Sequence, residues 1–116
     1  MQKNNVGRLI LAAAVGAAAS LTSTATMAGT NYGTVTKVSV REGLVYFTLS
    51  GAPLGRPGCA ANTTYFMVKD ENSAVGKQHM AILMTAQVTG RSVWVNGTNA
   101  CTKWPDGEDL REIALY

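Results

Sequence analysis

The chain has 116 residues, of which 47% are hydrophobic and 15% are charged, with 12 glycines and 3 prolines. This composition is that of a folded globular protein and excludes an extended disordered chain. The formal charge of +3 includes Lys3 and Arg8, which fall in an expected leader. The remainder carries eight basic against seven acidic residues, so the basic isoelectric point gives no support for nucleic-acid binding.

Residues 1–28 have the three-part layout of a secretory signal. A basic start (MQKNNVGR) precedes the apolar run Leu9–Leu21 (LILAAAVGAAASL), and small residues (TSTATMA) follow. The run is shorter than the roughly 20 apolar residues that cross a bilayer, and no cysteine follows it, which argues against a membrane or lipoprotein anchor. We expect cleavage after Ala28, with cleavage after Ala25 as the alternative. The predicted product is one domain, residues 29–116, of a secreted or periplasmic protein of bacterial type.

The expected domain holds two cysteines, Cys59 and Cys101. In an oxidising compartment an even count indicates one disulfide. Closing this loop would stabilise the fold by up to about 4 kcal/mol in the chain-entropy model. A lone pair so far apart is no zinc ligand set, and there is no C-x-x-C redox motif. We therefore predict a structural disulfide.

The first half of the domain reads as a β-hairpin. Tyr32–Val40 is rich in Val and Thr, and its apolar phase shifts between Val35 and Val38. Such a shift indicates a bulge or a strong bend. The polar turn 41–43 ends in Gly, and Leu44–Leu49 follows as the second strand.

Three more strands are predicted by their patterns. The Gly- and Pro-containing loop Ser50–Asn62 leads to a third strand, Thr63–Val68. Ser92–Asn96 is a fourth strand with Val on one face and Trp on the other. After a loop over Gly97–Glu108, Leu110–Leu115 closes the chain as a fifth strand.

One segment between the third and fourth strands has helical spacing. Asn72 or Ser73 is suited to cap it and Gly90 to end it. Because Gly76 weakens the first turn, the helix is best assigned to Lys77–Thr89. Its expected apolar stripe consists of Val75, His79, Ile82, Leu83 and Ala86, widened by Met80, Met84 and Val88.

The order of elements is β-β-β-α-β-β. A five-stranded barrel with its helix between the third and fourth strands is the arrangement of the OB-fold, and we predict an OB-fold-like, mainly β barrel. An open α+β sheet with one covering helix has the same order and stays as the alternative. In the barrel, the disulfide would join the loop before the third strand to the loop after the fourth.

The segment Ala81–Gly97 (AILMTAQVTGRSVWVNG), followed by Cys101, resembles the B-subunit family of subtilase cytotoxin, an AB5-type toxin, and small exported bacterial proteins of that OB-like type. A weaker similarity runs from Gly33-Thr34-Val35 to Gly43. The resemblance implies a ring-forming subunit that binds cell-surface glycans. Tyr32 stands where the toxin subunit has a sugar-contacting serine, and that subunit is longer with more cysteines. The sugar site itself is therefore not carried over.

Catalytic patterns are weak. The single histidine, His79, lies on the apolar side of the expected helix, where it is interpreted as a packing residue or the partner of a backbone carbonyl. There is no G-x-S-x-G motif, phosphate loop or metal-ligand cluster. A calcium site over Asp106–Asp109 would miss the EF-hand spacing. The acidic residues are interpreted as a turn (Asp70, Glu71) and a solvated loop (Asp106, Glu108, Asp109). We expect no enzyme, no cofactor and no metal.

Binding is the remaining function class. Sugar rings stack on aromatic faces, and protein interfaces favour Tyr, Trp, Met and Arg. The candidate ligand-binding residues are Tyr32, Tyr46, Arg91, Trp94 and Trp104, with Arg41 as a further cation. The structural alternative is that Trp94 or Tyr65 merely fills the edge of a small core.

Two functions fit these features of the sequence. The first is an exported binding module, similar to a toxin B subunit, that recognises a glycan or a protein partner. This module could form a homo-oligomer. The helix is interpreted mainly as packing on the core, and lining the channel of such a ring is the alternative. The second is a monomeric periplasmic accessory or structural protein without catalytic activity, in which Met80 and Met84 fill the core. Neither includes nucleic acid or a membrane span after signal removal.

Overall fold

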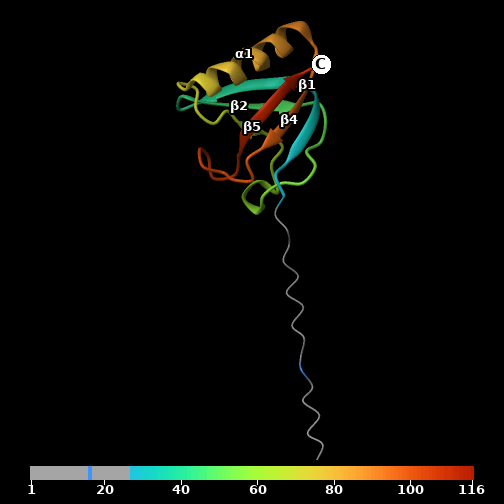
Figure 1. Cartoon of the computed structure of the whole chain (residues 1–116), viewed down its shortest axis with the longest axis vertical. Coiled ribbons are helices and arrows are strands. Elements are labelled where there is room, and N and C mark those ends of the chain that lie inside the picture. The colour runs from blue at the N-terminus through green and yellow to red at the C-terminus, as the bar shows by residue number, and fades with distance from the viewer. Residues whose placement is uncertain (1–15, 17–26) are drawn as a thin grey trace, which may run out of the picture.

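In the computed structural model, which describes Gly16 and residues 27–116, the chain forms a closed five-stranded barrel with one helix across one end (Figure 1). The predicted signal segment falls, apart from Gly16, Met27 and Ala28, outside the described residues and stays a prediction. The elements are β1 (Thr30–Arg41), β2 (Leu44–Leu49), η1 (Gly58–Ala60), β3 (Phe66–Met67), α1 (Ala74–Thr89), β4 (Ser92–Gly97) and β5 (Glu108–Leu115).

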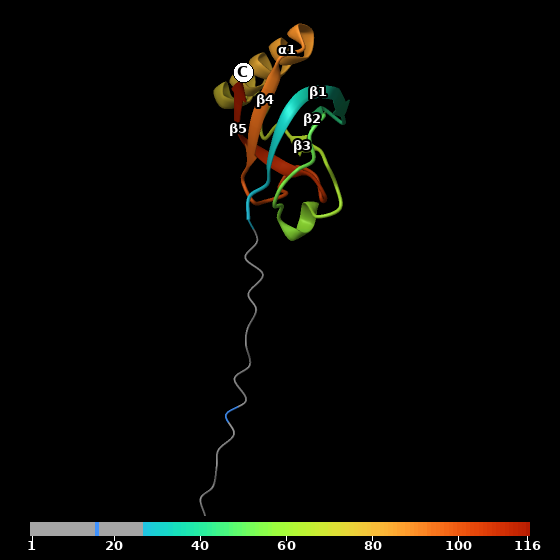
Figure 2. The ribbon, with the colours of Figure 1, turned by 90° about the vertical axis from the view of Figure 1, so that its right-hand side faces the viewer.

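The strands close in the order β1-β2-β3-β5-β4, and β4 pairs again with β1 (Figure 2). The β3–β5 pair is parallel, whereas the pairs β1–β2, β1–β4, β2–β3 and β4–β5 are antiparallel. Closure of the ring pairs every described strand on both sides, and this distinguishes the barrel from the open α+β sheet. The prediction of an OB-fold-like barrel is confirmed.

A bend in β1 makes the closure possible. Thr30–Thr34 pairs with β4, whereas Val35–Arg41 pairs with β2. The register shifts between Val35 and Lys37, where the sequence predicts a bulge, and a bulge increases the local twist and bends the strand. One strand therefore belongs to two neighbouring faces of the barrel.

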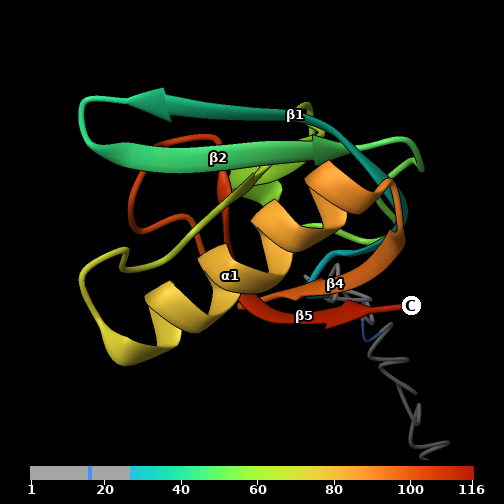
Figure 3. The ribbon, with the colours of Figure 1, turned by 90° about the horizontal axis from the view of Figure 1, so that it is seen from above.

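The core follows from alternation in the strands and from one side of the helix. In β2 and β4 every second residue is buried, and the rings of Phe47 and Phe66 stack with centroids 6.1 Å apart. Figure 3 shows α1 lying over the barrel end, between the β1–β2 pair and the β4–β5 pair. The buried core comprises Val45, Phe47, Leu49, Phe66, Val68, Leu83, Ala86, Val93, Val95, Leu110 and Ile113.

The helix buries a narrower stripe than predicted. Leu83 and Ala86 are buried as expected, but Val75, Met84 and Val88 are exposed, Val88 by 83%. The helix crosses the end of the barrel instead of lying along a sheet, so that only the side facing the opening is covered. The predicted widening of the stripe by Met84 and Val88 is wrong.

The helix also begins earlier than predicted. Ser73 is the N-cap, and its hydroxyl accepts a hydrogen bond from the backbone nitrogen of Gly76 at 2.9 Å. A Cβ at Gly76 would collide with the carbonyl of Asp70, so this glycine permits the close approach of the preceding loop. The cap and this packing offset the low helix propensity of glycine.

The third strand is much shorter than the predicted Thr63–Val68. The guanidinium of Arg56 donates from Nη1 to the carbonyl of Thr63 and from Nη2 to the carbonyl of Tyr65, both at 2.6 Å. Backbone carbonyls bound to a side chain are not available to a strand ladder. Regular pairing is therefore confined to Phe66–Met67.

The predicted disulfide is present. Cys59 and Cys101 are bonded, with their Cα atoms 6.3 Å apart, and they join the loop before β3 to the loop after β4, as the barrel requires. A disulfide is consistent with an oxidising compartment. Within the part of the chain that the structure describes, no helix has the length and hydropathy needed to span a bilayer.

Two acidic residues predicted to lie in a solvated loop are buried instead. Glu108 and Asp109 both have 0% exposure. The Asp109 carboxylate accepts hydrogen bonds from the backbone nitrogen and the hydroxyl of Thr102, while Glu108 binds backbone nitrogens and faces Arg56. These carboxylates are satisfied by distant loop groups, which a sequence pattern does not reveal. Asp106 is exposed as expected.

Candidate functional site

Aromatic rings and cations gather beside the β1–β2 hairpin. The guanidinium carbon of Arg41 lies 4.9 Å from the ring centroid of Tyr46 and 4.7 Å from that of Trp104. The ammonium of Lys37 lies 5.5 Å from the Tyr46 ring. These are cation–π distances. Arg41 thus links the hairpin to the loop between β4 and β5.

A second tyrosine extends this group. The ring of Tyr65 lies 5.2 Å from that of Tyr46, tilted by 57°, and its hydroxyl donates to the carboxylate of Asp106. Tyr65 comes from the segment that enters β3, and Asp106 from the β4–β5 loop. We call Lys37, Arg41, Tyr46, Tyr65 and Trp104 the hairpin cluster.

Local structure places each member of the hairpin cluster. Tyr46 stands opposite Ser39 in the β1–β2 ladder, on the outward side of β2 between buried Val45 and Phe47. Trp104 and Gly107 form a bridged turn, and a Cβ on Gly107 would meet the Tyr65 ring at 2.5 Å. The turn therefore docks directly on the tyrosine.

The environments of the two tyrosines shift their pKa values in opposite directions. A hydrogen bond from Ser39 lowers the pKa of Tyr46, and a hydrogen bond from Arg41 lowers it further, with the charges of Arg41 and Lys37 adding to the effect. Burial raises the pKa of Tyr65 to about 12, with a further contribution from its hydrogen bond to Asp106. The Tyr46 side of the hairpin cluster is thus electropositive.

We predict that Tyr65 ionises at a higher pH than Tyr46. Because its folded pKa is raised from 10.0 to about 12, its contribution to stability is complete below pH 10 and is lost as the pH rises through about 12. Near-ultraviolet absorbance titration of the wild type and of Tyr65→Phe should show the substitution removing a transition at about pH 12. Tyr46→Phe, the control, should remove an earlier one. Loss of a transition near 10 in Tyr65→Phe would contradict the prediction.

The other predicted ligand residues lie on a different face. Tyr32 pairs with Trp94 across the β1–β4 ladder, and its ring meets that of Tyr116 edge-on at 5.7 Å. The guanidinium of Arg91 donates to the carbonyl of Tyr116 at 2.7 Å. We call Tyr32, Arg91, Trp94 and Tyr116 the β1–β4 face. Two of these residues, Tyr32 and Trp94, line a hollow of about 320 Å³.

A basic hollow adjoins the hairpin cluster. It has a volume of about 460 Å³, and its lining includes Lys69, Lys103 and Arg111 together with Asp70. Lys103 precedes Trp104, so the hollow and the cluster share the β4–β5 loop. Figure 1 shows this loop, the hairpin tip and the start of α1 at the same side of the barrel.

His79 also lines this hollow, and its Nδ1 is buried with no hydrogen-bond partner among the described residues. Burial lowers the pKa of His79, and a backbone hydrogen bond at Arg111 opposes this shift as the smaller effect. This arrangement agrees with the interpretation of His79 as the partner of a backbone carbonyl. Over Gly16 and residues 27–116, no group of three or more His, Cys, Asp and Glu side chains could hold a metal ion.

The structure thus divides the five predicted ligand residues into two groups. Tyr46 and Trp104 belong to the hairpin cluster, whereas Tyr32, Trp94 and Arg91 belong to the β1–β4 face. The sequence patterns did not indicate Lys37, and they assigned Tyr65 no ligand role in a glycan site. The outward phase of β2 was the available signal for Tyr46, but no local pattern connects the hairpin with the distant loop of Trp104.

Comparisons of the chain with known protein families, with curated proteins and with solved structures find no match. The resemblance to the toxin B subunit therefore stays a prediction. The class defined by the fold is a small OB-fold-like barrel with one helix and one disulfide.

Proposed function

We propose that the protein is an exported binding module that recognises a glycan through the hairpin cluster. The observation that carries the proposal is the meeting of Tyr46, Tyr65 and Trp104 from three separate segments around Arg41. Sugar binding uses such rings, because the apolar face of a pyranose stacks on an aromatic face.

The place of the hairpin cluster in the barrel supports this function. OB-folds bind oligosaccharides and oligonucleotides on the face of strands 2 and 3, between the loop joining strands 1 and 2 and the loop joining strands 4 and 5. Tyr46 lies on β2, Arg41 ends β1, and Trp104 lies in the β4–β5 loop. The near-neutral charge of residues 29–116 and the expected export favour a glycan over a nucleic acid.

The cations of the hairpin cluster favour an acidic glycan. Arg41 is exposed and its planar fork suits a carboxylate or sulfate. Lys37 adds a second positive charge over the same ring. Because exposed charges are screened by salt, binding of an acidic glycan should weaken as ionic strength rises, whereas binding of a neutral glycan should change little.

We predict that Trp104→Ala weakens glycan binding by about fivefold or more, since truncating a central aromatic anchor costs over about 1 kcal/mol. The measurement is a glycan-array screen of the exported, oxidised protein, followed by titration of the best acidic and neutral ligands. Trp94→Ala, which removes the same side chain from the β1–β4 face, is the matched control and should bind like the wild type.

The outcomes separate the two faces. Binding that survives Trp104→Ala and Tyr46→Ala but is lost in Trp94→Ala would overturn the assignment to the hairpin cluster and move the site to the β1–β4 face. A complete absence of saturable binding would overturn the glycan proposal. The accessory-protein function would then lead.

The β1–β4 face favours a second role, contact with a protein or with another copy of the chain. Tyr32 is 54% exposed and Tyr116 is 62% exposed, and tyrosines are enriched at protein interfaces. Light scattering coupled to size exclusion measures the mass in solution. A ring-sized oligomer, five chains in particular, would support a toxin-B-like assembly, and a monomer at all workable concentrations would remove it.

A further inference from the structure

The buried carboxylate of Glu108 accepts a backbone hydrogen bond at the point where the chain enters the barrel. The backbone nitrogen of Gly29 lies 3.2 Å from Oε1 and 3.0 Å from Oε2 of Glu108. The backbone nitrogen of Asn99 also donates to Oε2, at 3.0 Å. Nε of Arg56 lies 3.6 Å from Oε1, and the two side chains are 6% and 0% exposed. The nitrogen of Gly29 therefore sits in a buried, charged site.

The packing around this nitrogen requires glycine. A Cβ at Gly29 would lie 2.5 Å from Oε1 of Glu108 and 2.7 Å from the carbonyl oxygen of Gly55. The carbonyl of Gly29 accepts from the backbone nitrogen of Gly97 at 2.8 Å, and a Cβ at Gly97 would collide with the same carboxylate. Two glycines thus let the backbone come within bonding distance of Glu108.

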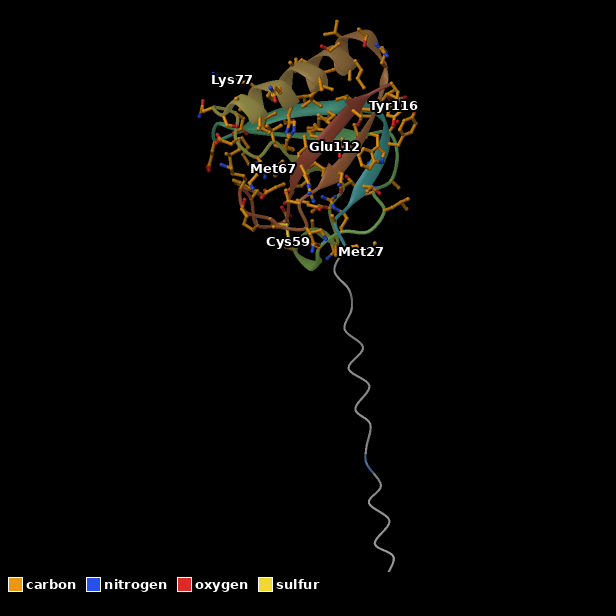
Figure 4. All side chains as sticks on the ribbon, in the orientation of Figure 1. Met27, Cys59, Met67, Lys77, Glu112 and Tyr116 are labelled. Carbon is orange, nitrogen blue, oxygen red and sulfur yellow. A yellow bond between two sulfur atoms is a disulfide. The ribbon has the colours of Figure 1, made fainter. Side chains whose placement is uncertain are left out.

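Exposure changes abruptly at this point. Met27 is 66% exposed, Ala28 is half-buried and Gly29 is buried. Figure 4 shows Met27 at the end of the barrel opposite α1. The first fully buried residue among those described is therefore Gly29, directly before β1, and it is the residue that would follow the expected cleavage after Ala28.

We propose that export processing hydrolyses the peptide bond between Ala28 and Gly29, and that the new α-ammonium of Gly29 becomes a buried ion partner of Glu108. In this step water adds to the carbonyl carbon of Ala28 and the C–N bond breaks. Ala28 leaves with a carboxylate, and Gly29 keeps an amine that takes up a proton. The proposal rests on the expected export and is independent of the glycan.

The charges at the site explain why an ammonium suits it better than an amide. In the uncut chain one N–H is shared between two carboxylate oxygens, whereas an ammonium offers three donors and a full charge. Arg56 leaves acceptor capacity on the Glu108 carboxylate, because its Nε makes no hydrogen bond with any described residue and its other nitrogens donate to the carbonyls of Thr63 and Tyr65. The ammonium would thus face Glu108 and, with like sign, Arg56.

The order of events follows from the burial. A peptidase cannot reach a peptide bond whose nitrogen is buried in the folded barrel, so cleavage must precede folding. The processed chain then gains an interaction that the unprocessed chain lacks.

The test uses the full chain, expressed with its leader in a bacterium and recovered after export. Intact mass and N-terminal sequencing should identify Gly29 as the first residue. Acetylation of the α-amino group should be at least about tenfold slower in the folded protein than in urea. Lys77, exposed on α1 and far from the site in Figure 4, is the internal control and should react similarly in both states.

A variant separates the two parts of the proposal. Glu108→Gln removes the charge, and the α-amino group should then react as quickly as an exposed one while the mass still starts at Gly29. If this variant does not fold, the acetylation rates of the wild type in the folded state and in urea still test the proposal. A first residue at Thr26, or an α-amino group that reacts equally fast in both states, would overturn the proposal. An uncleaved protein retained in the cytoplasm would overturn the expected export with it.

Discussion

Replacing Glu108 with alanine is expected to lower the free energy of unfolding by about 3–5 kcal/mol, the usual cost of removing one partner of a buried ion pair. The substitution would leave Arg56 without its counter-charge in a buried place and the backbone nitrogens of Gly29 and Asn99 without this acceptor. Urea unfolding followed by tryptophan fluorescence measures the change.

The matched control is Glu112→Ala, which removes an exposed glutamate from the same strand. Its effect should stay within about 0.5 kcal/mol. Similar losses in Glu108→Ala and Glu112→Ala would contradict the structural role of the buried pair. A double-mutant cycle that combines Glu108→Ala with Arg56→Gln measures the coupling energy between Glu108 and Arg56. This energy should be well above that of a pair of surface charges.

Removing the disulfide with Cys59→Ala and Cys101→Ala together is expected to lower the free energy of unfolding by about 4 kcal/mol. The two residues are 42 apart in sequence, and a cross-link over a loop of that length restricts the unfolded chain by about this amount in the chain-entropy model. Urea midpoints of the oxidised wild type and of the double variant measure the difference.

The disulfide has its own control. The fully reduced wild type should have the same urea midpoint as the double alanine variant, because both lack the cross-link. The two proteins differ only in the side chains at positions 59 and 101. An unchanged midpoint in both would show that the loops carrying Cys59 and Cys101 are held together by other contacts, among them the hydrogen bonds that Thr63 and Tyr65 donate to Asp106. A lower urea midpoint in the double alanine variant, but not in the reduced wild type, would assign the loss of stability to altered side-chain packing at positions 59 and 101.

Short-range patterns predicted most of the secondary structure. Val45, Phe47 and Leu49 alternate with outward residues, and β2 has the predicted bounds. The phase shift after Val35 corresponds to the bulge that bends β1. Ser73 and Gly90 limit the helix as expected. Each of these features depends on neighbours within a few residues, so each can be read from the sequence alone.

The helix face and the third strand show where such patterns fail. Val75 and Val88 have helical spacing, but the side of α1 that is covered depends on how the helix crosses the barrel end. Thr63–Val68 has the residues of a strand, but Arg56 donates hydrogen bonds to two backbone carbonyls of this segment. In both cases a tertiary contact overrides a local preference.

The sequence by itself determined the order of the elements, the bulge, the helix caps and the disulfide, because alternation, capping and cysteine count act locally or by number. Only the tertiary structure decided that Arg41 lies over the rings of both Tyr46 and Trp104 and that Tyr32 pairs with Trp94. It alone also decided that Glu108 is buried against Gly29 and Arg56. The physical reason is closure of the barrel. The bend in β1 and the ring of strands bring distant segments together, and no pattern within one segment specifies which distant residue its side chains will face.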